Sequence, residues 1–283
     1  MAEITAALIK DLRDKTDCGM MDAKRALTET GGNMDAAIEL LRKQGTLKGG
    51  KVAGRNTTQG RVGIALSKDG KHCAVVAIEC ETDFTARNDK FIALTDTVAA
   101  NFAEKGGDIG ASPTVKDALT KLIATTGENM KLGKSQRLTL TGVGFFGTYL
   151  HSDFKLGVAV QIEGDDGKSD GAKLLGKDLA MHAAANNPIA LDKTGVPADV
   201  IAKERSILAE AAKNDPKNAG KPANIIEKIA EGQIGAFLKD RCFVEQPFVK
   251  DPKVSVTQQV ENVGKTIGKT LKVTAYTRIK VGE

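Results

Sequence analysis

The 283-residue sequence lacks the features that mark membrane-bound and secreted proteins. No apolar run approaches the ~20 residues that a membrane-spanning helix needs. The first residues, MAEITAALIKDLRDK, carry charges throughout and contain no apolar segment of the kind found in secretory signals. We therefore expect a cytoplasmic protein without a membrane anchor.

Cysteine is scarce and scattered. The sequence contains no C-x-x-C pair, and structural zinc sites need ligands at such close spacings. We therefore expect no metal site, and no motif in the sequence predicts a cofactor. Free thiols in a reducing compartment are the expected state of all four cysteines, Cys18, Cys73, Cys80 and Cys242.

The sequence also has few aromatic residues and no strong excess of one charge. It contains no tryptophan and two tyrosines, and 41 basic residues stand against 36 acidic ones, a formal net charge of +5. Little surface is available for stacking nucleic-acid bases, and the charge is too mild to require a nucleic-acid partner. The densest basic stretch, residues 48–61, is rich in glycine and fits a solvated linker equally well.

Helical periodicity dominates the N-terminal part. Apolar residues recur at helical spacing in three short stretches within residues 3–44, and Gly31-Gly32 separates the last two. Asn33 is the predicted N-cap of the third helix. Residues 45–60 contain five glycines and no apolar stripe, which predicts a linker.

A strand–strand–helix pattern follows the linker. Residues 62–67 and 73–80 are predicted strands on either side of Asp69-Gly70, a strong hairpin signal. Asn88 is the predicted cap of the next helix, whose face carries Phe91 and Val98.

The same pattern then recurs, which predicts two related α+β lobes with antiparallel sheets. Residues 135–150 and 154–164 resemble strands, and a helix is expected from about residue 171 to 186, before Pro188.

Two further helices are predicted over residues 197–240, each with a proline in its first turn, Pro197 and Pro222. We expect them to form an antiparallel helical hairpin inserted into the second lobe. The last residues alternate apolar and polar side chains, so a final strand returns to the second sheet. The expected domains are a helical domain with its linker, a first lobe, the start of a second lobe, the hairpin and the completion of the second lobe. Their ranges are 1–55, 56–140, 141–196, 197–240 and 241–283.

No catalytic constellation stands out. The glycines of GVGFFG, residues 142–147, match a dinucleotide fingerprint, but strand-like sequence follows where a helix is required. Close contacts within a sheet explain them better. His151 is followed by Ser152-Asp153, and contiguity alone does not make a triad. His182 fits the face of an amphipathic helix. Because no set of catalytic residues is apparent in the sequence, we expect a binding protein rather than an enzyme.

The segment TDFTAR, residues 82–87, raises a different question. It follows AVVAIEC, the most apolar short run of the chain. Composition alone predicts that Asp83 caps a turn and that Phe84 folds back into the core.

Two stretches change that expectation. LRDKTDCGMMDAKRAL, residues 12–27, and CETDFTAR, residues 80–87, resemble the signature segments of translation elongation factor Ts, the guanine-nucleotide exchange factor for elongation factor Tu. Four more segments have counterparts in the same order, so the resemblance extends over essentially the whole chain. They are residues 127–131, 149–160, 178–185 and 245–252.

The resemblance implies roles for particular residues. The N-terminal bundle resembles a ubiquitin-associated domain and would dock on the nucleotide domain of elongation factor Tu through Met20, Met21 and Lys24. In the alternative, the methionines only pack the bundle. Phe84 would act as a wedge between two partner helices, and residues 82–85 would dislodge magnesium indirectly. The residues of this tip are Thr82, Asp83, Phe84 and Thr85, and the supporting contacts are Thr126, Gly127, His151 and Val249.

The sequence departs from the family pattern in three places. Glu79 and Glu81 stand where amide side chains are common, and Thr85 stands where valine is common. The chain stops at Glu283, without the extra C-terminal helix of some members, so affinity is expected to rest more on the remaining sites.

Two alternatives stay open. The helical hairpin can dimerise members of this family, or its thin apolar face covers its own lobe. The second hypothesis for function is a basic α+β RNA- or ribosome-binding module without exchange activity, whose binding weakens steeply with salt.

Overall fold

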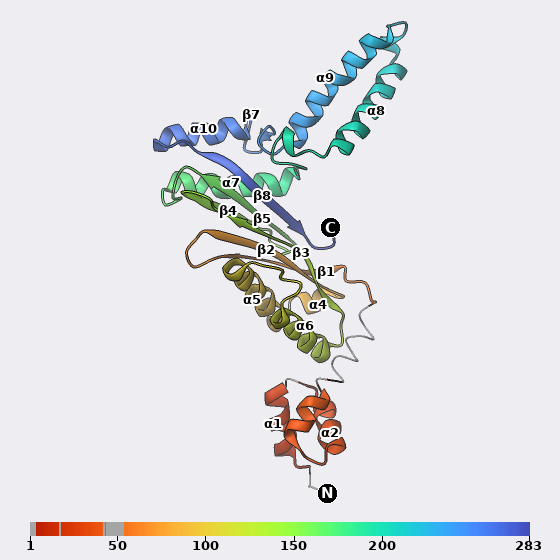
Figure 1. Cartoon of the computed structure of the whole chain (residues 1–283), viewed down its shortest axis with the longest axis vertical. Coiled ribbons are helices and arrows are strands. Elements are labelled where there is room, and N and C mark those ends of the chain that lie inside the picture. The colour runs from red at the N-terminus through yellow and green to blue at the C-terminus, as the bar shows by residue number, and fades with distance from the viewer. Residues whose placement is uncertain (1–3, 17, 42, 44–53) are drawn as a thin grey trace. The chain divides into compact units, whose positions relative to one another are not determined.

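The computed structural model describes residues 4–16, 18–41, 43 and 54–283. Helices and small antiparallel sheets alternate along the chain, which confirms the α+β class (Figure 1). The chain divides into two compact units. The first comprises residues 1–137, 150–157 and 279–283, and the second comprises residues 138–149 and 158–278. Within the described ranges, no helix has both the length and the apolar character needed to cross a membrane.

The N-terminal helices lie where the sequence predicts them. α1 spans Ala6–Thr16, α2 spans Met20–Glu29, and residues 34–41 are also helical. The Asn33 side chain accepts a hydrogen bond from the Ala36 N–H at 3.0 Å, which confirms the predicted cap. A small core is fully buried among these helices; it consists of Leu12, Ala23, Ala26, Leu27 and Ala37. The likeness to a ubiquitin-associated domain stays a prediction.

The predicted linker is too long at its C-terminal end. Residues 44–53 lie outside the described residues, but β1 already begins at Gln59. Gly60 pairs with Glu79 in the sheet and has a φ of 150°, and a Cβ there would lie 2.2 Å from the Ile78 carbonyl oxygen. This glycine therefore serves a close approach of two strands rather than a linker.

The sheet of the first unit has the order β1-β2-β3. β1, Gln59–Leu66, and β2, His72–Cys80, form the predicted antiparallel hairpin, and Asp69 accepts a hydrogen bond from the Lys71 N–H in its turn. β3 spans Met130–Thr139. The prediction of one strand-like segment over residues 135–150 is therefore wrong, because β3 ends at Thr139 and the next strand belongs to another sheet.

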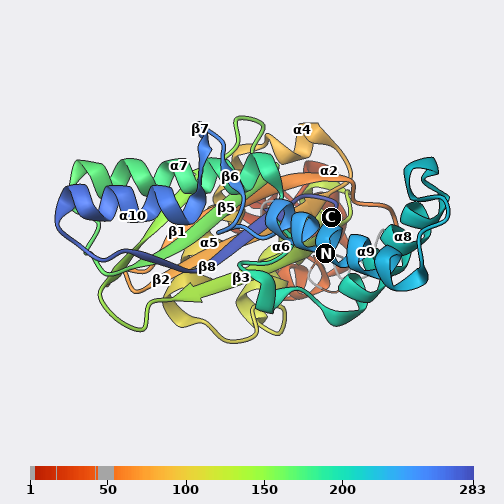
Figure 2. The same ribbon diagram turned by 90° about the horizontal axis from the view of Figure 1, so that it is seen from above.

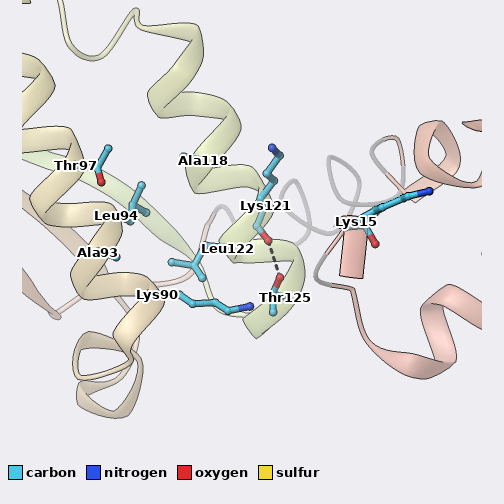
Figure 3. A pocket seen from close by; sticks show the side chains of 10 residues that line it. Lys15, Lys90, Ala93, Leu94, Thr97, Ala118, Lys121, Leu122 and Thr125 are labelled. Atoms are coloured by element: carbon cyan, nitrogen blue, oxygen red, sulfur yellow. Dashed lines mark hydrogen bonds between the residues drawn. The ribbon is translucent and has the colours of Figure 1, made fainter. Parts of the chain in front are cut away.

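Three helices accompany this sheet. α4 is a single turn, Asp83–Ala86; α5 spans Asp89–Lys105, and α6 spans Pro113–Thr126. The Asn88 side chain caps α5 as predicted, whereas α4 and α6 were not predicted. Figure 3 shows Leu94 of α5 and Leu122 of α6 beside a pocket that both helices line. Phe91, Val98 and Phe102 of α5 pack in the core with β2, which fixes the strand that leads to α4.

The second sheet has the order β4-β5-β8. Its strands are β4, Gly144–Leu150, β5, Leu156–Glu163, and β8, Lys272–Lys280, the predicted final strand. α7 spans Asp170–Asn186, close to the predicted range. A Cβ on Gly147 would lie 2.1 Å from the Gly176 carbonyl oxygen of α7. Close packing of strand and helix therefore accounts for this glycine of the GVGFFG segment.

The helical hairpin consists of α8, Ala198–Asn214, and α9, Ala223–Arg241, which lie side by side. Short 3-10 turns at Lys193–Gly195 and Pro216–Asn218 precede and follow α8. Pro197 and Pro222 occupy the N-cap positions rather than the first turn, a one-residue correction to the prediction.

The chain then forms β6, Pro247–Phe248, and β7, Asp251–Ser255, a short antiparallel pair. α10, Val256–Ile267, was not predicted; it begins with a capping box between Ser255 and Gln258. Figure 2 shows α7 and α10 side by side, and the two helices are in contact. The predicted domain boundaries and the kinship of the two lobes stay predictions.

Candidate functional site

Phe84 is the most exposed large apolar residue among the described residues. Its side chain is 84% exposed, so the prediction that it folds back into the core is wrong. It lies on α4, directly after the buried strand β2. Thr85 and Ala86 of the same turn are buried, so the helix is anchored on one side and presents Phe84 on the other.

Thr82 holds this turn in place. Its side-chain oxygen accepts a hydrogen bond from the Thr85 N–H at 3.3 Å, which makes it the N-cap of α4. Its hydroxyl donates to Glu128 Oε1 at 2.7 Å, and its N–H donates to Glu128 Oε2 at 3.1 Å. One carboxylate therefore binds both polar groups of Thr82. Glu128 follows the C-cap of α6. No role was predicted for Glu128 from the sequence, although its neighbours Thr126 and Gly127 were predicted contacts.

Asp83 does not cap the turn, in contrast to the prediction from composition. Its carboxylate forms an ion pair with Arg87 at 3.2 Å, and both side chains are exposed. Exposed ion pairs contribute about 0–1 kcal/mol, so this pair does little to hold the turn. The carboxylate stays accessible beside Phe84, at the first turn of the helix, where negative charge is favoured.

Cys80 is the last residue of β2 and lies two positions before Thr82, the N-cap of α4. It is buried and donates a hydrogen bond to the Thr82 carbonyl oxygen at 3.2 Å. Burial, followed by the nearby Glu128 carboxylate, raises the pKa of Cys80 to about 12. The group is therefore an uncharged packing and hydrogen-bonding element.

The two glutamates that depart from the family pattern have partners within the first unit. Glu81 accepts a hydrogen bond from the Asn129 N–H at 2.6 Å. Glu79 is buried, accepts from the Thr57 hydroxyl at 3.2 Å and pairs with Lys131 at 3.1 Å. Both carboxylates join β2 to neighbouring segments.

A groove of about 730 Å³ lies beside α4. The start of β1, the α4 turn and the loop of residues 152–155 line it, and Phe84 and Phe154 both contribute to it. The groove thus combines exposed aromatic rings with charged side chains, a composition suited to a protein partner.

Comparison with known proteins identifies the family. A family model described as Elongation factor TS matches residues 81–283. The chain belongs to the elongation factor Ts family. Elongation factor Ts of Nitratidesulfovibrio vulgaris (strain DP4) is 40% identical over 283 residues, which cover 99% of this chain and 96% of the relative. That of Methylococcus capsulatus is 42% identical over 289 residues, with 99% and 92% covered. That of Thiobacillus denitrificans is 44% identical over 270 residues, with 93% and 88% covered.

The residues proposed from the elongation factor Ts pattern fall into separate places. Thr126 and Gly127 lie beside the tip, because Glu128 connects them to Thr82. Gly127 is the C-cap of α6 with a φ of 74°, a conformation that favours glycine. His151 is exposed and begins the loop whose later residues line the groove.

Met20, Met21 and Lys24 lie on α2 of the N-terminal bundle. The methionine side chains are 60% and 75% exposed, and Lys24 is exposed as well. The alternative in which the methionines pack the bundle is therefore wrong. Their docking role in elongation factor Ts stays a prediction.

Val249 lies in the turn between β6 and β7, and its side chain is exposed. Its N–H donates to Nδ1 of the buried His182 at 3.1 Å. Since Nδ1 accepts, the ring proton is on Nε2, which lies 3.0 Å from Gln246 Oε1 and donates to it. Burial lowers the pKa of His182. His182 is thus a neutral core residue that fixes the Val249 turn, whereas the sequence predicted a place on an amphipathic face.

Proposed function

We propose that this chain releases GDP from elongation factor Tu by inserting the α4 tip, with Phe84 as a wedge, into the partner's nucleotide domain. Membership of the elongation factor Ts family supports a role as nucleotide exchange factor in translation elongation, which displaces the hypothesis of an RNA-binding module without exchange activity. An exchange factor needs no covalent chemistry, so the chain acts by binding and not as an enzyme. The proposed site of action is the cytoplasm, and no nucleic acid is part of the proposed complex.

The proposal rests on the exposure of Phe84. A phenylalanine that is 84% exposed leaves most of its apolar surface in water in the free protein. Burial of a side chain of this size stabilises a complex by about 1.5–3 kcal/mol. The Thr82–Glu128 hydrogen bonds fix the start of the turn that carries the exposed ring, so a partner can bury the ring without first displacing the turn.

Asp83 is proposed to act beside the wedge. A GTPase holds GDP through phosphate contacts and a magnesium ion. Once Phe84 separates two partner helices, the exposed Asp83 carboxylate accepts hydrogen bonds from the displaced surface and disturbs the polar groups around magnesium. Thr85 is buried and would act only as the anchor of this turn.

More than one contact is required. The factor must bind the nucleotide-free partner more tightly than the GDP-bound partner, and by linkage the nucleotide weakens the factor's grip equally. A shift from 1:99 to 99:1 needs a difference of about 5.5 kcal/mol, more than one side chain supplies. We propose supporting contacts from two further groups: Met20, Met21 and Lys24 on α2, and Thr126, Gly127, His151 and Val249.

The helical hairpin is proposed to form a homodimer contact. Ile207 of α8 and Ile225 of α9 are exposed, which supports an additional partner for this hairpin. The ubiquitin-associated likeness of the N-terminal bundle is proposed with it, as a docking module and not as a ubiquitin receptor.

The test is a stopped-flow measurement of GDP dissociation from elongation factor Tu, with the wild type, Phe84→Ala and Leu66→Ala. Leu66 is a matched control, because it is 52% exposed and lies at the opposite end of β1 from the tip. We expect Phe84→Ala to reduce the catalysed rate about tenfold or more, the loss typical of a central interface residue. An unchanged rate with Phe84→Ala would overturn the wedge, and no acceleration by the wild type would overturn the exchange function.

A further inference from the structure

The backbone of Phe154 is in an unusual conformation. Its φ is 59°, and within the described ranges only Asn187 is another non-glycine residue with positive φ. Asparagine tolerates this region, whereas a bulky side chain there is an outlier. Such outliers persist only where the surroundings impose them, and they cluster at functional sites.

Backbone hydrogen bonds impose this conformation. The Phe154 N–H donates to the His151 carbonyl oxygen at 2.8 Å, and the Phe154 carbonyl accepts from the Val62 N–H of β1 at 2.7 Å. The next carbonyl, that of Lys155, accepts from the Val281 N–H at 2.9 Å. Glycine would make the same bonds without strain, so these bonds do not explain a phenylalanine at this position.

The side chain of Phe154 therefore needs another explanation. It is 42% exposed and lies under a guanidinium group, with Arg61 Cζ at 3.9 Å from the ring centroid. Arg61 forms no ion pair with a carboxylate in the part of the chain that the structure describes, and its Nε there is buried without a hydrogen-bond partner. The ring holds the guanidinium by a cation–π contact and leaves its charge without an anion.

Arg61 and Phe154 line the same groove as Phe84. The groove has two other cations: Arg87 forms an exposed ion pair with Asp83, and Lys155 donates to the neutral side chain of Gln59. Arg61 differs from both because it lies against the exposed Phe154 ring, so one partner segment can meet a positive charge and an apolar surface together. The groove is continuous with the tip, so one partner can cover both.

We infer that Phe154 and Arg61 form a second contact for elongation factor Tu, next to the Phe84 wedge. This contact takes a partner segment in which an apolar side chain lies close to a carboxylate. The apolar group packs on the Phe154 ring, and the carboxylate receives charge-assisted hydrogen bonds from Arg61. Arginine and aromatic residues are the types enriched at interface positions that dominate affinity. The inference rests on the proposed function and assigns it a further specificity-determining pair.

Phe154→Gly separates binding from folding. Glycine removes the ring and relieves the backbone, so we expect the thermal midpoint to be unchanged or higher. We expect the Kd for nucleotide-free elongation factor Tu to rise about tenfold. Arg61→Gln leaves the loop backbone intact, and it should raise the Kd and reduce its dependence on salt, since one charged contact is lost. Leu66→Ala is the control that should leave the Kd at the wild-type value.

Each outcome decides the inference. A lower midpoint for Phe154→Gly with an unchanged Kd would show that the ring only packs the loop. Unchanged Kd values for both variants would overturn the contact. A variant that alters sedimentation of the isolated chain but not its binding to the GTPase would assign the groove to a second copy and overturn the inference. If the wild type binds the GTPase without accelerating GDP release, the proposed function fails, while the ratio of Kd values still tests this pair.

Discussion

Thr82 and Glu128 are joined by two hydrogen bonds, from the Thr82 hydroxyl at 2.7 Å and from its N–H at 3.1 Å. The two residues are 46 positions apart in the sequence. The bonds connect the start of α4 to the end of α6. The exposed Phe84 is therefore carried by a turn that is fixed at its base.

Removal of this connection should affect exchange more than stability. Thr82→Ala removes the cap of α4 and one bond to Glu128, at a cost of about 1 kcal/mol in the free energy of unfolding. Ser169→Ala is the matched control, because Ser169 caps α7 in the second unit and should cost a similar amount. We expect the catalysed GDP release to fall only for Thr82→Ala. Equal rates for the two variants, with urea unfolding confirming equal stability losses, would contradict a role for the fixed turn.

Truncation of two phenylalanines close in sequence should change the free energy of unfolding by very different amounts. Phe84 is exposed, so Phe84→Ala should change the free energy of unfolding by less than about 0.5 kcal/mol. Phe91 is fully buried against β2, so Phe91→Ala should cost about 3–5 kcal/mol. Chemical denaturation of both variants tests the pair. A large loss for Phe84→Ala would show that the ring packs in solution.

The glycines of GVGFFG offer a test within one segment. A Cβ on Gly147 would lie 2.1 Å from the Gly176 carbonyl oxygen, whereas a Cβ on Gly142 would meet nothing within 4 Å. Gly147→Ala should therefore destabilise the protein by about 1–3 kcal/mol or more, because backbone must move, and Gly142→Ala should have little effect. Thermal unfolding followed by circular dichroism measures both. Equal midpoints would mean that β4 and α7 approach less closely.

Stability should depend on pH through His182. Burial lowers the pKa of His182 below its ordinary value of 6.5. At a pH between the two pKa values, His182 is therefore protonated in the unfolded chain and neutral in the folded chain. The contribution of neutral His182 to the free energy of unfolding is complete above pH ~6.5. It is lost as the pH falls from there towards the pKa of His182 in the folded chain. A proton on Nδ1 would also face the Val249 N–H that donates to it. We expect the free energy of unfolding to fall between about pH 7.5 and pH 5, and His182→Gln to remove this loss. Parallel unfolding curves for both proteins across this range would contradict the role of His182.

Local patterns predicted those parts of the fold that local interactions determine. The β1–β2 hairpin follows from its apolar segments and from Asp69-Gly70 between them. Asn33 and Asn88 cap helices through bonds to residues two or three positions away. α6 was missed although a signal was present, since Pro113 opens it and Val115 and Leu122 share a buried face.

The details of the site depend on distant residues. α4 has four residues, too few for any periodicity, and it is fixed by Glu128 from beyond α6. His182 could not be placed in the core from its own helix, because its partner Gln246 is 64 positions away. The exposure of Phe84 contradicts what composition predicts for an aromatic residue, and only the family resemblance indicated it.

The buried Cys80 thiol has a consequence for how the protein withstands oxidants. The thiolate is the form that peroxides attack, and a pKa of about 12 leaves this sulfur protonated at neutral pH. The sulfur also contacts the Thr82 carbonyl at the base of the tip, so its oxidation would disturb the turn that presents Phe84. Its position in the core therefore protects the base of the tip from oxidation.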